Sequence, residues 1–336
     1  MADVHLSLEQ VFDLAYLCLS SNGCNHDNAA AIARTLQRAE RDACASHGLF
    51  RLPGYVASLQ SGKVNGDAES EVRRISPAVI QVDGKRGFAP LALERGRDPL
   101  IEAARENGIA ALALINVHHF AALWAEVEPI AERGLAAMAF TTYKSALVPA
   151  GSKQAFFGTN PMSFGWPRGD QPPLVFDQAS AAMARGEVMI AARDGHTLPP
   201  GVGIDADGVA TNDPNQILEG GAQLPFGGHK GSALAMMIEL LVAGLTGQDF
   251  SFEATINDNN DGGPPNGGEL MIAIDPTRFG DADNWLSHSE TFITRLAGLE
   301  GARLPGDRRY NNRSKSDQDG VFVPEALYQK CLELKN

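Results

Sequence analysis

Apolar residues recur at helical spacing along the first sixty residues of the chain. Ser7 and Gln10 have the spacing of a capping box ahead of an apolar stripe that includes Val11 and Leu14, and Gly23 is placed to end this helix. Two further helices are expected before residue 62. The pattern therefore predicts a helical start to the chain.

From about residue 70 the pattern changes to short buried strands that alternate with amphipathic helices. Strands are predicted at 78–84, 109–117, 135–143, 172–177 and 269–276, and helices at 91–107 and 125–134. The stretch 231–247 is apolar nearly all round, which predicts a helix that is buried on most sides. Two more helices are expected at 284–299 and 324–335, separated by the basic turn 303–313.

The composition narrows the class of protein. The 28 lysines and arginines against 41 acidic residues give a net charge of −13, which disfavours nucleic acid and membranes as partners. The 4 cysteines show no C-x-x-C spacing and are too few for a disulfide scaffold in 336 residues. The first ten residues do not resemble a signal peptide, and Glu239 interrupts the longest apolar run. We expect a soluble, cytoplasmic protein.

Ser46, His47 and Arg51 stand on an expected connection between two helices. In the plainest interpretation they are a helix cap, an ordinary histidine and a solvated charge. A hydrolase is disfavoured, because neighbouring residues seldom point their side chains at each other and a G-x-S-x-G elbow is missing. A third interpretation makes His47 a proton donor and Arg51, about one helical turn away, the anchor of a substrate carboxylate.

Metal chemistry has weak support in the sequence. His118 and His119 are adjacent rather than spaced to converge on one ion, and no H-E-x-x-H motif is present. The loop 257–268 has some calcium-loop character, but Asn257 and Gly268 stand where acidic ligands are needed. We therefore expect no metal.

Cofactor binding must use something other than the common dinucleotide fingerprint. No G-x-G-x-x-G precedes a helix, so an ordinary Rossmann fold has no support. Phosphates could bind at 225–231, where glycines, His229 and Lys230 precede a long helix, and at 303–309, which carries three arginines. The segment 120–124 offers two aromatic faces and small alanines, which suit contact with a flat ring.

Six segments carry these motifs: SHGLFRLPGY, HHFAALW, FGTNPMSFGWP, VFDQAS, LPFGGHKGSAL and RLPGDRR. Together they resemble the malate/L-lactate dehydrogenase family that lacks a Rossmann fold and also holds ureidoglycolate and sulfolactate dehydrogenases. The resemblance runs nearly the whole chain. HHFAALWAEVEP and LPGDRRY favour the branch of Δ1-piperideine-2-carboxylate/Δ1-pyrroline-2-carboxylate reductases, which reduce cyclic imines with NADPH.

The resemblance implies a role for each matching position. Ser46 matches a charge-relay serine, His47 a proton donor and Arg51 the site of the substrate carboxylate. Glu187 stands where reductases carry an acidic relay residue, and Thr159 matches a substrate-side position. The cofactor-contacting positions that the resemblance implies are His119, Phe120, Ala121, Ala122, Leu123, Asp177, Gln178, Ala179, His229, Lys230, Arg303, Leu304, Pro305, Gly306, Asp307, Arg308 and Arg309.

The chemistry of an imine reductase suits these residues. The reaction needs a hydride at C2 of the ring and a proton on the ring nitrogen, and an imidazolium near neutral pH can supply the proton. Glu187 is our candidate for the carboxylate that favours the charged form of His47. The expected apolar walls for the substrate ring are Phe120, Trp124, Met162 and Phe164.

The implied fold is α/β (α+β): a mixed or antiparallel sheet domain that binds NADPH without a Rossmann fold, and a helical domain formed by both chain ends. We expect residues 1–70 plus 285–336 to form the helical dimerisation domain and residues 71–284 to bind NADPH and substrate. The implied homodimer reduces Δ1-piperideine-2-carboxylate to L-pipecolate and Δ1-pyrroline-2-carboxylate to L-proline, in lysine catabolism and proline metabolism, with NADH as the weaker cofactor. The alternative is an NAD(P)-dependent 2-hydroxy acid dehydrogenase of the malate, lactate or ureidoglycolate type.

Overall fold

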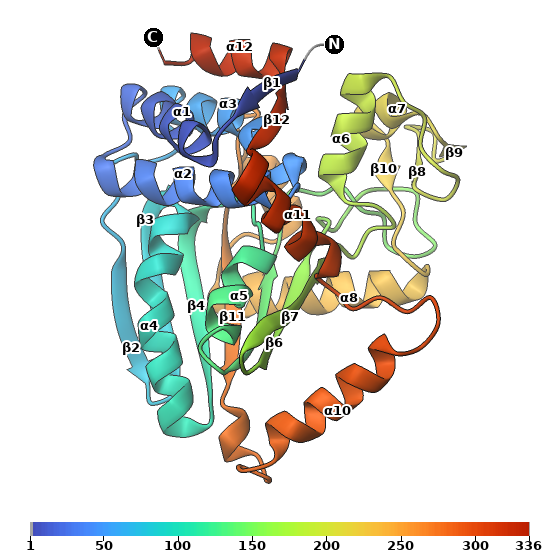
Figure 1. Cartoon of the computed structure of the whole chain (residues 1–336). Coiled ribbons are helices and arrows are strands. Elements are labelled where there is room, and N and C mark those ends of the chain that lie inside the picture. Colours follow the sequence, from blue (N-terminus) through green and yellow to red (C-terminus); the bar gives the residue numbers. More distant parts are fainter. Residues whose placement is uncertain (1–2, 336) are drawn as a thin grey trace.

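A seven-stranded mixed sheet forms the centre of the computed structural model, which describes residues 3–335 (Figure 1). Its strand order is β2-β3-β4-β11-β5-β6-β7. The strands are β2 (Glu71–Ser76), β3 (Val79–Phe88), β4 (Ile109–His118), β5 (Ala136–Thr141), β6 (Met162–Arg168), β7 (Gln171–Gln178) and β11 (Asn266–Ile274). β3 and β4 pair in parallel, and the other neighbours in this sheet pair antiparallel.

This sheet confirms the predicted fold class. The five predicted strands correspond to β3, β4, β5, β7 and β11, while β2 and β6 were not predicted. β2 is an edge strand whose side chains are mostly exposed, so it lacks the buried apolar run that marks the others. β11 comes from late in the chain and lies between β4 and β5, antiparallel to both. That insertion is what separates this sheet from a parallel, doubly wound one.

Two helices cover one face of the sheet. α4 (Ala89–Asn107) packs on β3 and β4, and α5 (Trp124–Ala131) packs on β5 and β6. Leu100 from α4 and Val127 from α5 are fully buried in the same apolar cluster as Leu112 from β4. The core therefore fixes the end of β4 and the start of α5, and the connection between them carries His119.

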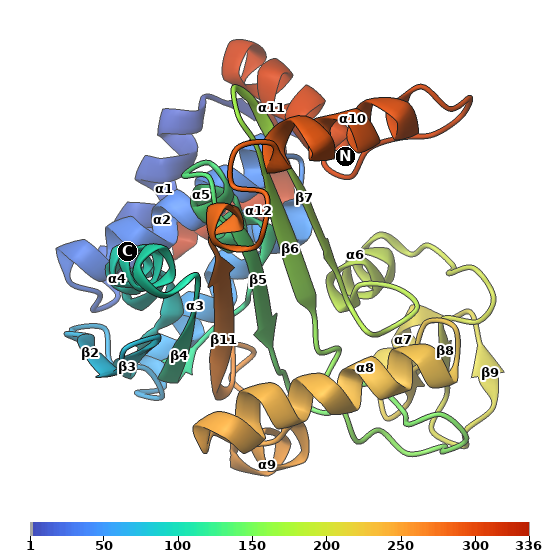
Figure 2. The ribbon, with the colours of Figure 1, turned by 90° about the horizontal axis from the view of Figure 1, so that it is seen from below.

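The opposite face carries α8 (His229–Glu239), which continues as a π-helical stretch (Leu240–Gly244), and α9 (Ser251–Asn257), as Figure 2 shows. Ile238 and Val242 pack against the sheet. The prediction that this helix is buried on most sides is wrong, because its outer side is open: Met236 is 53% exposed, Leu240 57% and Leu245 67%. Neither this helix nor any other in residues 3–335 has the length and apolarity to cross a bilayer.

The two chain ends meet in a layer on top of the sheet. β1 (Asp3–Leu6) pairs antiparallel with β12 (Val321–Pro324), a pairing that the helical prediction for both ends missed. The helices of this layer are α1 (Leu8–Ser21), α2 (His26–Arg41), α3 (Leu52–Gln60) and α12 (Glu325–Glu333). The capping box of Ser7 and Gln10 forms as predicted. Residues of β12 and α12 share one buried cluster with α1, α2 and α3.

A smaller lobe lies beside the sheet, at the right of Figure 1. It contains a three-stranded sheet and two helices: β8 (Gly203–Ile204), β9 (Ala210–Thr211), β10 (Ala222–Gln223), α6 (Arg185–Asp194) and α7 (Pro214–Leu218). Two 3₁₀ turns, Ala45–His47 and Leu49–Arg51, connect α2 to α3, and the first of them contacts α6. The boundary between the lobe and the rest of the molecule therefore passes through the Ser46–His47 segment.

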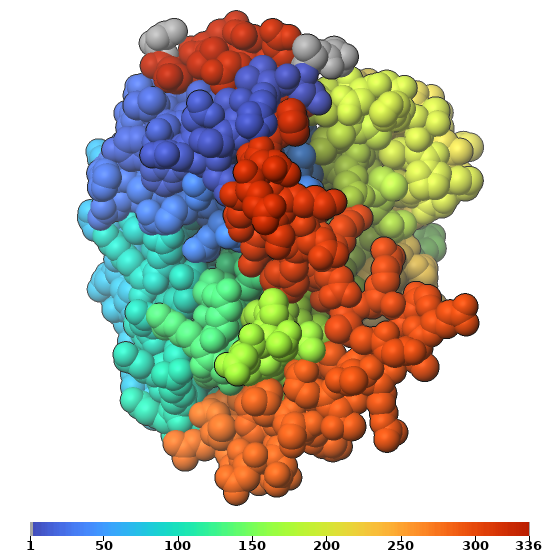
Figure 3. Space-filling view, viewed as in Figure 1, coloured from blue at the N-terminus to red at the C-terminus, as the bar shows by residue number. Residues whose placement is uncertain are grey.

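The last long segment crosses this boundary. α10 (Trp285–Ala297) projects from the body, and α11 (Asp307–Asp319) lies across the molecule between the helical layer and the lobe (Figure 3). The prediction of a turn over 303–313 is wrong from Asp307 onward. Tertiary contacts hold this polar helix: Arg313 pairs with Asp42 at 2.7 Å and with Glu128 at 2.9 Å, and the Tyr310 hydroxyl donates to the Pro173 carbonyl at 2.7 Å.

Candidate active site

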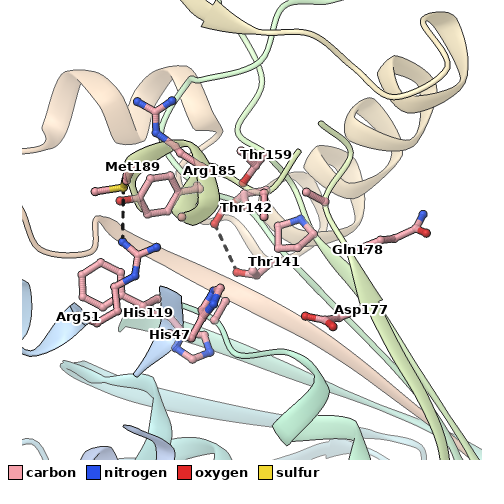
Figure 4. A pocket seen from close by; sticks show the side chains of 17 residues that line it. His47, Arg51, His119, Thr141, Thr142, Thr159, Asp177, Gln178, Arg185 and Met189 are labelled. Atoms are coloured by element: carbon pink, nitrogen blue, oxygen red, sulfur yellow. Dashed lines mark hydrogen bonds between the residues drawn. The ribbon is translucent and has the colours of Figure 1, made fainter. Parts of the chain in front are cut away.

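A pocket opens where the turns at 45–51 meet the ends of β4, β5 and β7 and the start of α6 (Figure 4). Segments that are far apart in the sequence converge here. Of the residues singled out in the sequence, those that line the pocket are His47, Arg51, His119, Phe120, Ala121, Thr159, Asp177, Gln178 and Ala179. One cavity is thus lined by His47, Arg51 and Thr159, the expected catalytic and substrate-binding residues, and by some of the expected cofactor-binding residues.

Ser46 and His47 lie in a single 3₁₀ turn and hydrogen-bond to each other. Ser46 Oγ is 3.0 Å from His47 Nδ1. The argument that neighbouring side chains seldom meet is therefore wrong for this pair, because a tight turn does not alternate side-chain directions as an extended strand does. With Nδ1 engaged by the hydroxyl, Nε2 is the ring nitrogen left for a ligand.

The His47 ring is neutral at physiological pH in this structure. Burial lowers its pKa to about 3, and the positive charges of Arg51 and His119 act in the same direction. These surroundings do not by themselves favour the expected imidazolium, and the role of His47 as proton donor stays a prediction. A proton on His47 has to be favoured by something that enters the pocket, and an anion beside Arg51 would have that effect.

Arg51 presents a half-buried positive charge to the pocket. Its Nε donates to the Ser46 carbonyl at 2.7 Å, and its guanidinium lies 4.8 Å from the centre of the Phe120 ring. No carboxylate among residues 3–335 forms an ion pair with it, and burial lowers its pKa. Because Arg51 is half-buried and has no carboxylate partner in that range, it attracts an anion that enters the pocket.

The pocket holds a second cation that was not predicted from the sequence. Arg185, the first residue of α6, lines the cavity, and burial lowers its pKa. Met189, one turn later, places its sulfur 3.8 Å from Arg51 Nη1. In the sequence, Arg185 stands out only as the single basic residue among the small and apolar residues of segment 181–186. Together, Arg51 and Arg185 make the pocket attractive to anions.

Glu187 lies outside the pocket. It is exposed on the first turn of α6, and within the described chain no hydrogen bond joins it to His47. Its neighbour Gly186 instead approaches Ser46, because a Cβ at Gly186 would lie only 2.7 Å from the Ser46 Cβ. The backbone of α6, rather than the Glu187 side chain, therefore lies against Ser46. The role of the Glu187 carboxylate stays a prediction.

A buried ionisable cluster adjoins the pocket wall. His119 Nε2 lies 2.6 Å from Glu126 Oε1 and 3.4 Å from Glu269 Oε2. Burial opposes the charge on His119, but the two carboxyl groups outweigh it and raise its pKa to about 10. The pKa of Glu269 is raised well above its ordinary value by burial and by Glu126. The pKa of Glu126 is lowered because His119 outweighs the effect of burial.

These three groups are also the one arrangement in residues 3–335 whose ligand atoms could converge on a metal ion, all within 4.8 Å of one another. The 2.6 Å contact is a direct hydrogen bond between the ring and a carboxylate, and a protonated ring has no lone pair for a metal at that nitrogen. The ion pair is therefore the state that this geometry favours. The sequence feature that pointed to this cluster was Glu269, a single charged residue at the start of the apolar predicted strand 269–276.

The remaining cofactor positions gather around the end of β7. Arg309 Nη2 lies 3.0 Å from Asp177 Oδ1, and its guanidinium stands 5.0 Å from the Trp124 ring. Its Nε is buried and has no partner among residues 3–335. Ala122 and Leu123 are buried below the pocket wall.

Two helix starts adjoin the same strand end. α8 begins at His229, and the residues just before it bond to the chain beyond β7, with Phe226 N donating to the Ser180 carbonyl at 3.1 Å. α11 begins at Asp307 after Gly306, whose φ of +94° suits glycine. Neither helix has a side-chain cap. The other predicted cofactor positions of these two turns are Lys230, Arg303, Leu304, Pro305 and Arg308, of which all but Leu304 are exposed.

Uncapped helix N-termini with basic side chains bind phosphate groups well. Here Arg309, from the start of α11, stands over the Trp124 ring and pairs with Asp177, which lines the pocket. The residues present therefore fit a phosphate-bearing cofactor that runs from the helix starts into the pocket.

Known proteins support this interpretation. Residues 6–331 match the family model described as malate/L-lactate dehydrogenase. The chain is 48% identical over 333 residues to a Δ1-pyrroline-2-carboxylate reductase of Ancylobacter novellus, covering 98% of this chain and 97% of that protein. It is 42% identical to a (2R)-3-sulfolactate dehydrogenase (NADP⁺) of Chromohalobacter salexigens, covering 96% and 95%.

A solved structure agrees. The Δ1-piperideine-2-carboxylate reductase of Pseudomonas syringae pv. tomato superposes with a TM-score of 0.93 at 45% identity, covering 98% of this chain and 99% of that one. The resemblance inferred from the sequence, including its reductase branch, is thus confirmed. This chain belongs to the malate/L-lactate dehydrogenase family of nicotinamide-dependent oxidoreductases.

Proposed function

We propose that this protein reduces cyclic imino acids with NADPH, converting Δ1-piperideine-2-carboxylate to L-pipecolate and Δ1-pyrroline-2-carboxylate to L-proline. The observation that carries the proposal is the half-buried, unpaired guanidinium of Arg51 beside the hydrogen-bonded Ser46–His47 pair. This arrangement offers an anchor for a carboxylate next to a group that can hold a proton. The names and coverage of the reductases described above support it.

Arg51 would hold the substrate carboxylate in a bidentate fork and so fix the position of the imine carbon. Of the expected apolar walls, Phe120 lines the pocket, whereas Trp124, Met162 and Phe164 do not. Met189 and Ala184 take their place. The difference arises because β6 directs Phe164 toward Trp166 and Phe176. Thr159, on the pocket wall, would donate to a polar edge of the substrate.

His47 would deliver the proton to the ring nitrogen. A bound carboxylate offsets the charge of Arg51, one of the causes that lower the His47 pKa, and so makes the ring easier to protonate when substrate is present. The Ser46 hydroxyl holds the ring orientation through Nδ1. A bound reduced nicotinamide supplies the hydride that C2 of the imine accepts. Glu187 remains a proposed relay residue that could reach this pair only by a change of its side-chain position.

The basic residues at the two helix starts would hold the phosphates of NADPH. Replacing Lys230 or Arg308 with alanine should raise the KM for NADPH by about tenfold or more while the KM for the imine stays nearly constant, since a charged hydrogen bond contributes about 1.5–3 kcal/mol. Steady-state kinetics with each substrate varied in turn measures this. An unchanged KM for NADPH in both variants would show that these side chains are merely solvated.

We further propose a homodimer in the cytoplasm, with residues 1–70 plus 285–336 as its helical dimerisation domain and 71–284 as the sheet domain that binds NADPH and substrate. The proposed interface extends beyond the helical domain, because a second copy would also cover apolar side chains that stand open in the sheet domain, on α8, the π-helical stretch and α9. These are Met236, Leu240, Leu245, Phe252 and Ile256. Five large apolar side chains exposed within residues 236–256 support an interface there, because large exposed apolar areas mark interaction sites. Sedimentation at equilibrium tests the assembly.

A 2-hydroxy acid dehydrogenase is the second candidate, and Arg185 is the observation that favours it. Two unpaired cations in one pocket suit a substrate with two acidic groups, and one relative is named for sulfolactate. Absorbance of the reduced cofactor, followed with both cyclic imines, pyruvate and oxaloacetate, and with NADPH and NADH, decides between the candidates. No cofactor oxidation with either imine would overturn the proposed function, and a clear preference for a 2-oxo acid would favour the alternative.

A further inference from the structure

One acidic residue interrupts the longest apolar run of the sequence, and the structure buries it. Glu239 is the last residue of α8, where the helix continues as the π-helical stretch, and it is only 5% exposed. π-Helical turns inside a helix are frequent at functional sites. Glu239 does not line the active pocket, so it can influence the reaction only through other residues.

Three donor groups converge on the Glu239 carboxylate. Asn160 Nδ2 donates to Oε1 at 2.8 Å, the Ser251 backbone N–H donates to Oε2 at 3.1 Å, and the Ser251 hydroxyl donates to Oε1. Asn160 and Ser251 are themselves buried. A carboxylate only accepts hydrogen bonds, so it suits this arrangement, whereas an amide in its place would turn an NH₂ group toward a donor.

Asn160 connects this carboxylate to the pocket wall. Its neighbours on both sides, Thr159 and Pro161, line the active pocket. Its φ of +37° is a left-handed backbone conformation that residues other than glycine seldom adopt. Asn160 Nδ2 also donates to the Ala235 carbonyl of α8 at 3.1 Å. The bonds of the Asn160 side chain therefore hold the unusual backbone that presents Thr159 to the pocket.

A second wall of the pocket joins the same network. The Ser180 hydroxyl donates to the Asn160 carbonyl at 2.8 Å, and the Ser180 backbone N–H donates to the Thr159 carbonyl at 2.8 Å. Ser180 directly follows Gln178 and Ala179, which line the pocket (Figure 4). Asn160 thus links two walls of the pocket to one buried carboxylate.

We propose that Glu239 is a positioning residue for the imine substrate: through Asn160 it holds Thr159 in the orientation in which Thr159 meets the bound substrate. The proposal rests on the proposed function, in which Thr159 donates to a polar edge of the imino acid. The start of α8 at His229, which we propose to bind phosphate, lies about three helical turns from Glu239. Loss of the carboxylate should therefore weaken substrate binding and spare cofactor binding.

The test is a double-mutant cycle. Glu239→Gln keeps the size of the side chain but cannot accept from all three donor groups, so its KM for the imine should rise about tenfold, with kcat and the KM for NADPH within about twofold of wild type. Thr159→Val, which removes the hydroxyl, should raise the same KM by a similar factor. The double variant should match Thr159→Val alone, because a hydroxyl that is absent cannot be misplaced.

Ser251→Ala tests the same path from a residue that does not line the pocket. Ser251 is the first residue of α9, and this variant removes only its hydroxyl. Its KM for the imine should rise about two- to fivefold, and combination with Thr159→Val should add nothing to the effect of Thr159→Val. This milder variant tests the positioning role even if Glu239→Gln does not fold.

Glu128→Gln is the matched control, because Glu128 is similarly buried, on α5, but pairs with Arg313 away from the pocket. It should lower the free energy of unfolding and keep the wild-type KM for the imine. Urea unfolding of each variant shows which changes in KM accompany a mere loss of stability.

Increases in KM that multiply in the double variants would overturn the proposal, because Glu239 would then act by a route other than Thr159. An unchanged KM for the imine in Ser251→Ala and in folded Glu239→Gln would also overturn it and leave Glu239 a purely structural residue. Wild-type enzyme that oxidises no NADPH with either imine would overturn the proposed function instead. The two failures are distinguishable, because the positioning role is judged only on variants of an active parent.

Discussion

Two histidines share one pocket, but one ring is neutral and the other is charged. Burial lowers the pKa of His47 to about 3, with Arg51 and His119 adding to the effect. His119 is also buried, yet Glu126 and Glu269 raise its pKa to about 10. Burial pushes both rings toward the neutral form, so the sign of the neighbouring charges decides the outcome. The pocket therefore combines a ring that can accept a proton with one that already holds an extra proton.

The largest expected effect comes from removing the neutral ring. His47→Gln should lower kcat for the imine about 10²- to 10⁴-fold, the range for loss of a general acid, because Gln keeps a polar side chain but exchanges no proton near neutral pH. Quenching of tryptophan fluorescence by NADPH should remain, since the helix starts that we propose to bind its phosphates are untouched. A variant with nearly full kcat would show that His47 is not the proton donor.

The next effect tests the cation beside His47. Arg51→Gln should raise the KM for the imine about 10- to 150-fold, because a charged hydrogen bond of about 1.5–3 kcal/mol is lost. It should also raise the pKa of His47, which loses a positive neighbour. NMR titration of the ring signals measures the second result.

The control for Arg51 is Arg34→Gln, which removes a partly exposed arginine that pairs with Glu94 away from the pocket. Both the KM and the His47 pKa should stay at their wild-type values in this control. If the pKa of His47 did not rise in Arg51→Gln either, burial alone would account for its neutral state.

The smallest effect is on stability, and it has opposite signs for the two rings. The folded-state pKa of His119 lies above the ordinary 6.5, so its contribution is present below about pH 6.5 and is lost as pH rises toward about 10. The folded-state pKa of His47 lies below 6.5, so its contribution is present above about pH 6.5 and is lost as pH falls toward about 3.

Urea unfolding from pH 5 to pH 9 separates these contributions. Relative to wild type, His119→Gln should flatten the loss of unfolding free energy on the alkaline side, and His47→Gln the loss on the acid side. Identical pH dependence in both variants would contradict the assignment of a neutral His47 and a charged His119.

Much of the fold could be predicted because its signals are local. Apolar runs such as 109–117 marked strands, and the Ser7–Gln10 pair marked the start of a helix. α11 could not be predicted, since its sequence is almost wholly polar and its helix is held by ion pairs of Arg313 with Asp42 and Glu128, which are remote in the sequence. The open side of α8 could not be predicted for the same reason, because an apolar sequence does not show whether another element covers it.

The sequence by itself determined the chemistry available at 46–51: a hydroxyl, an imidazole and a guanidinium in one short turn, in an order that resembles a dehydrogenase family. Only the tertiary structure decided which of these groups are charged. The pKa of a side chain depends on burial and on charges within a few ångströms, and those charges come from residues as distant in sequence as His119, Glu126 and Glu269. Local pattern carries no information about such distances, so the second cation, Arg185, and the pair of carboxyl groups behind the pocket emerge only once the chain is folded.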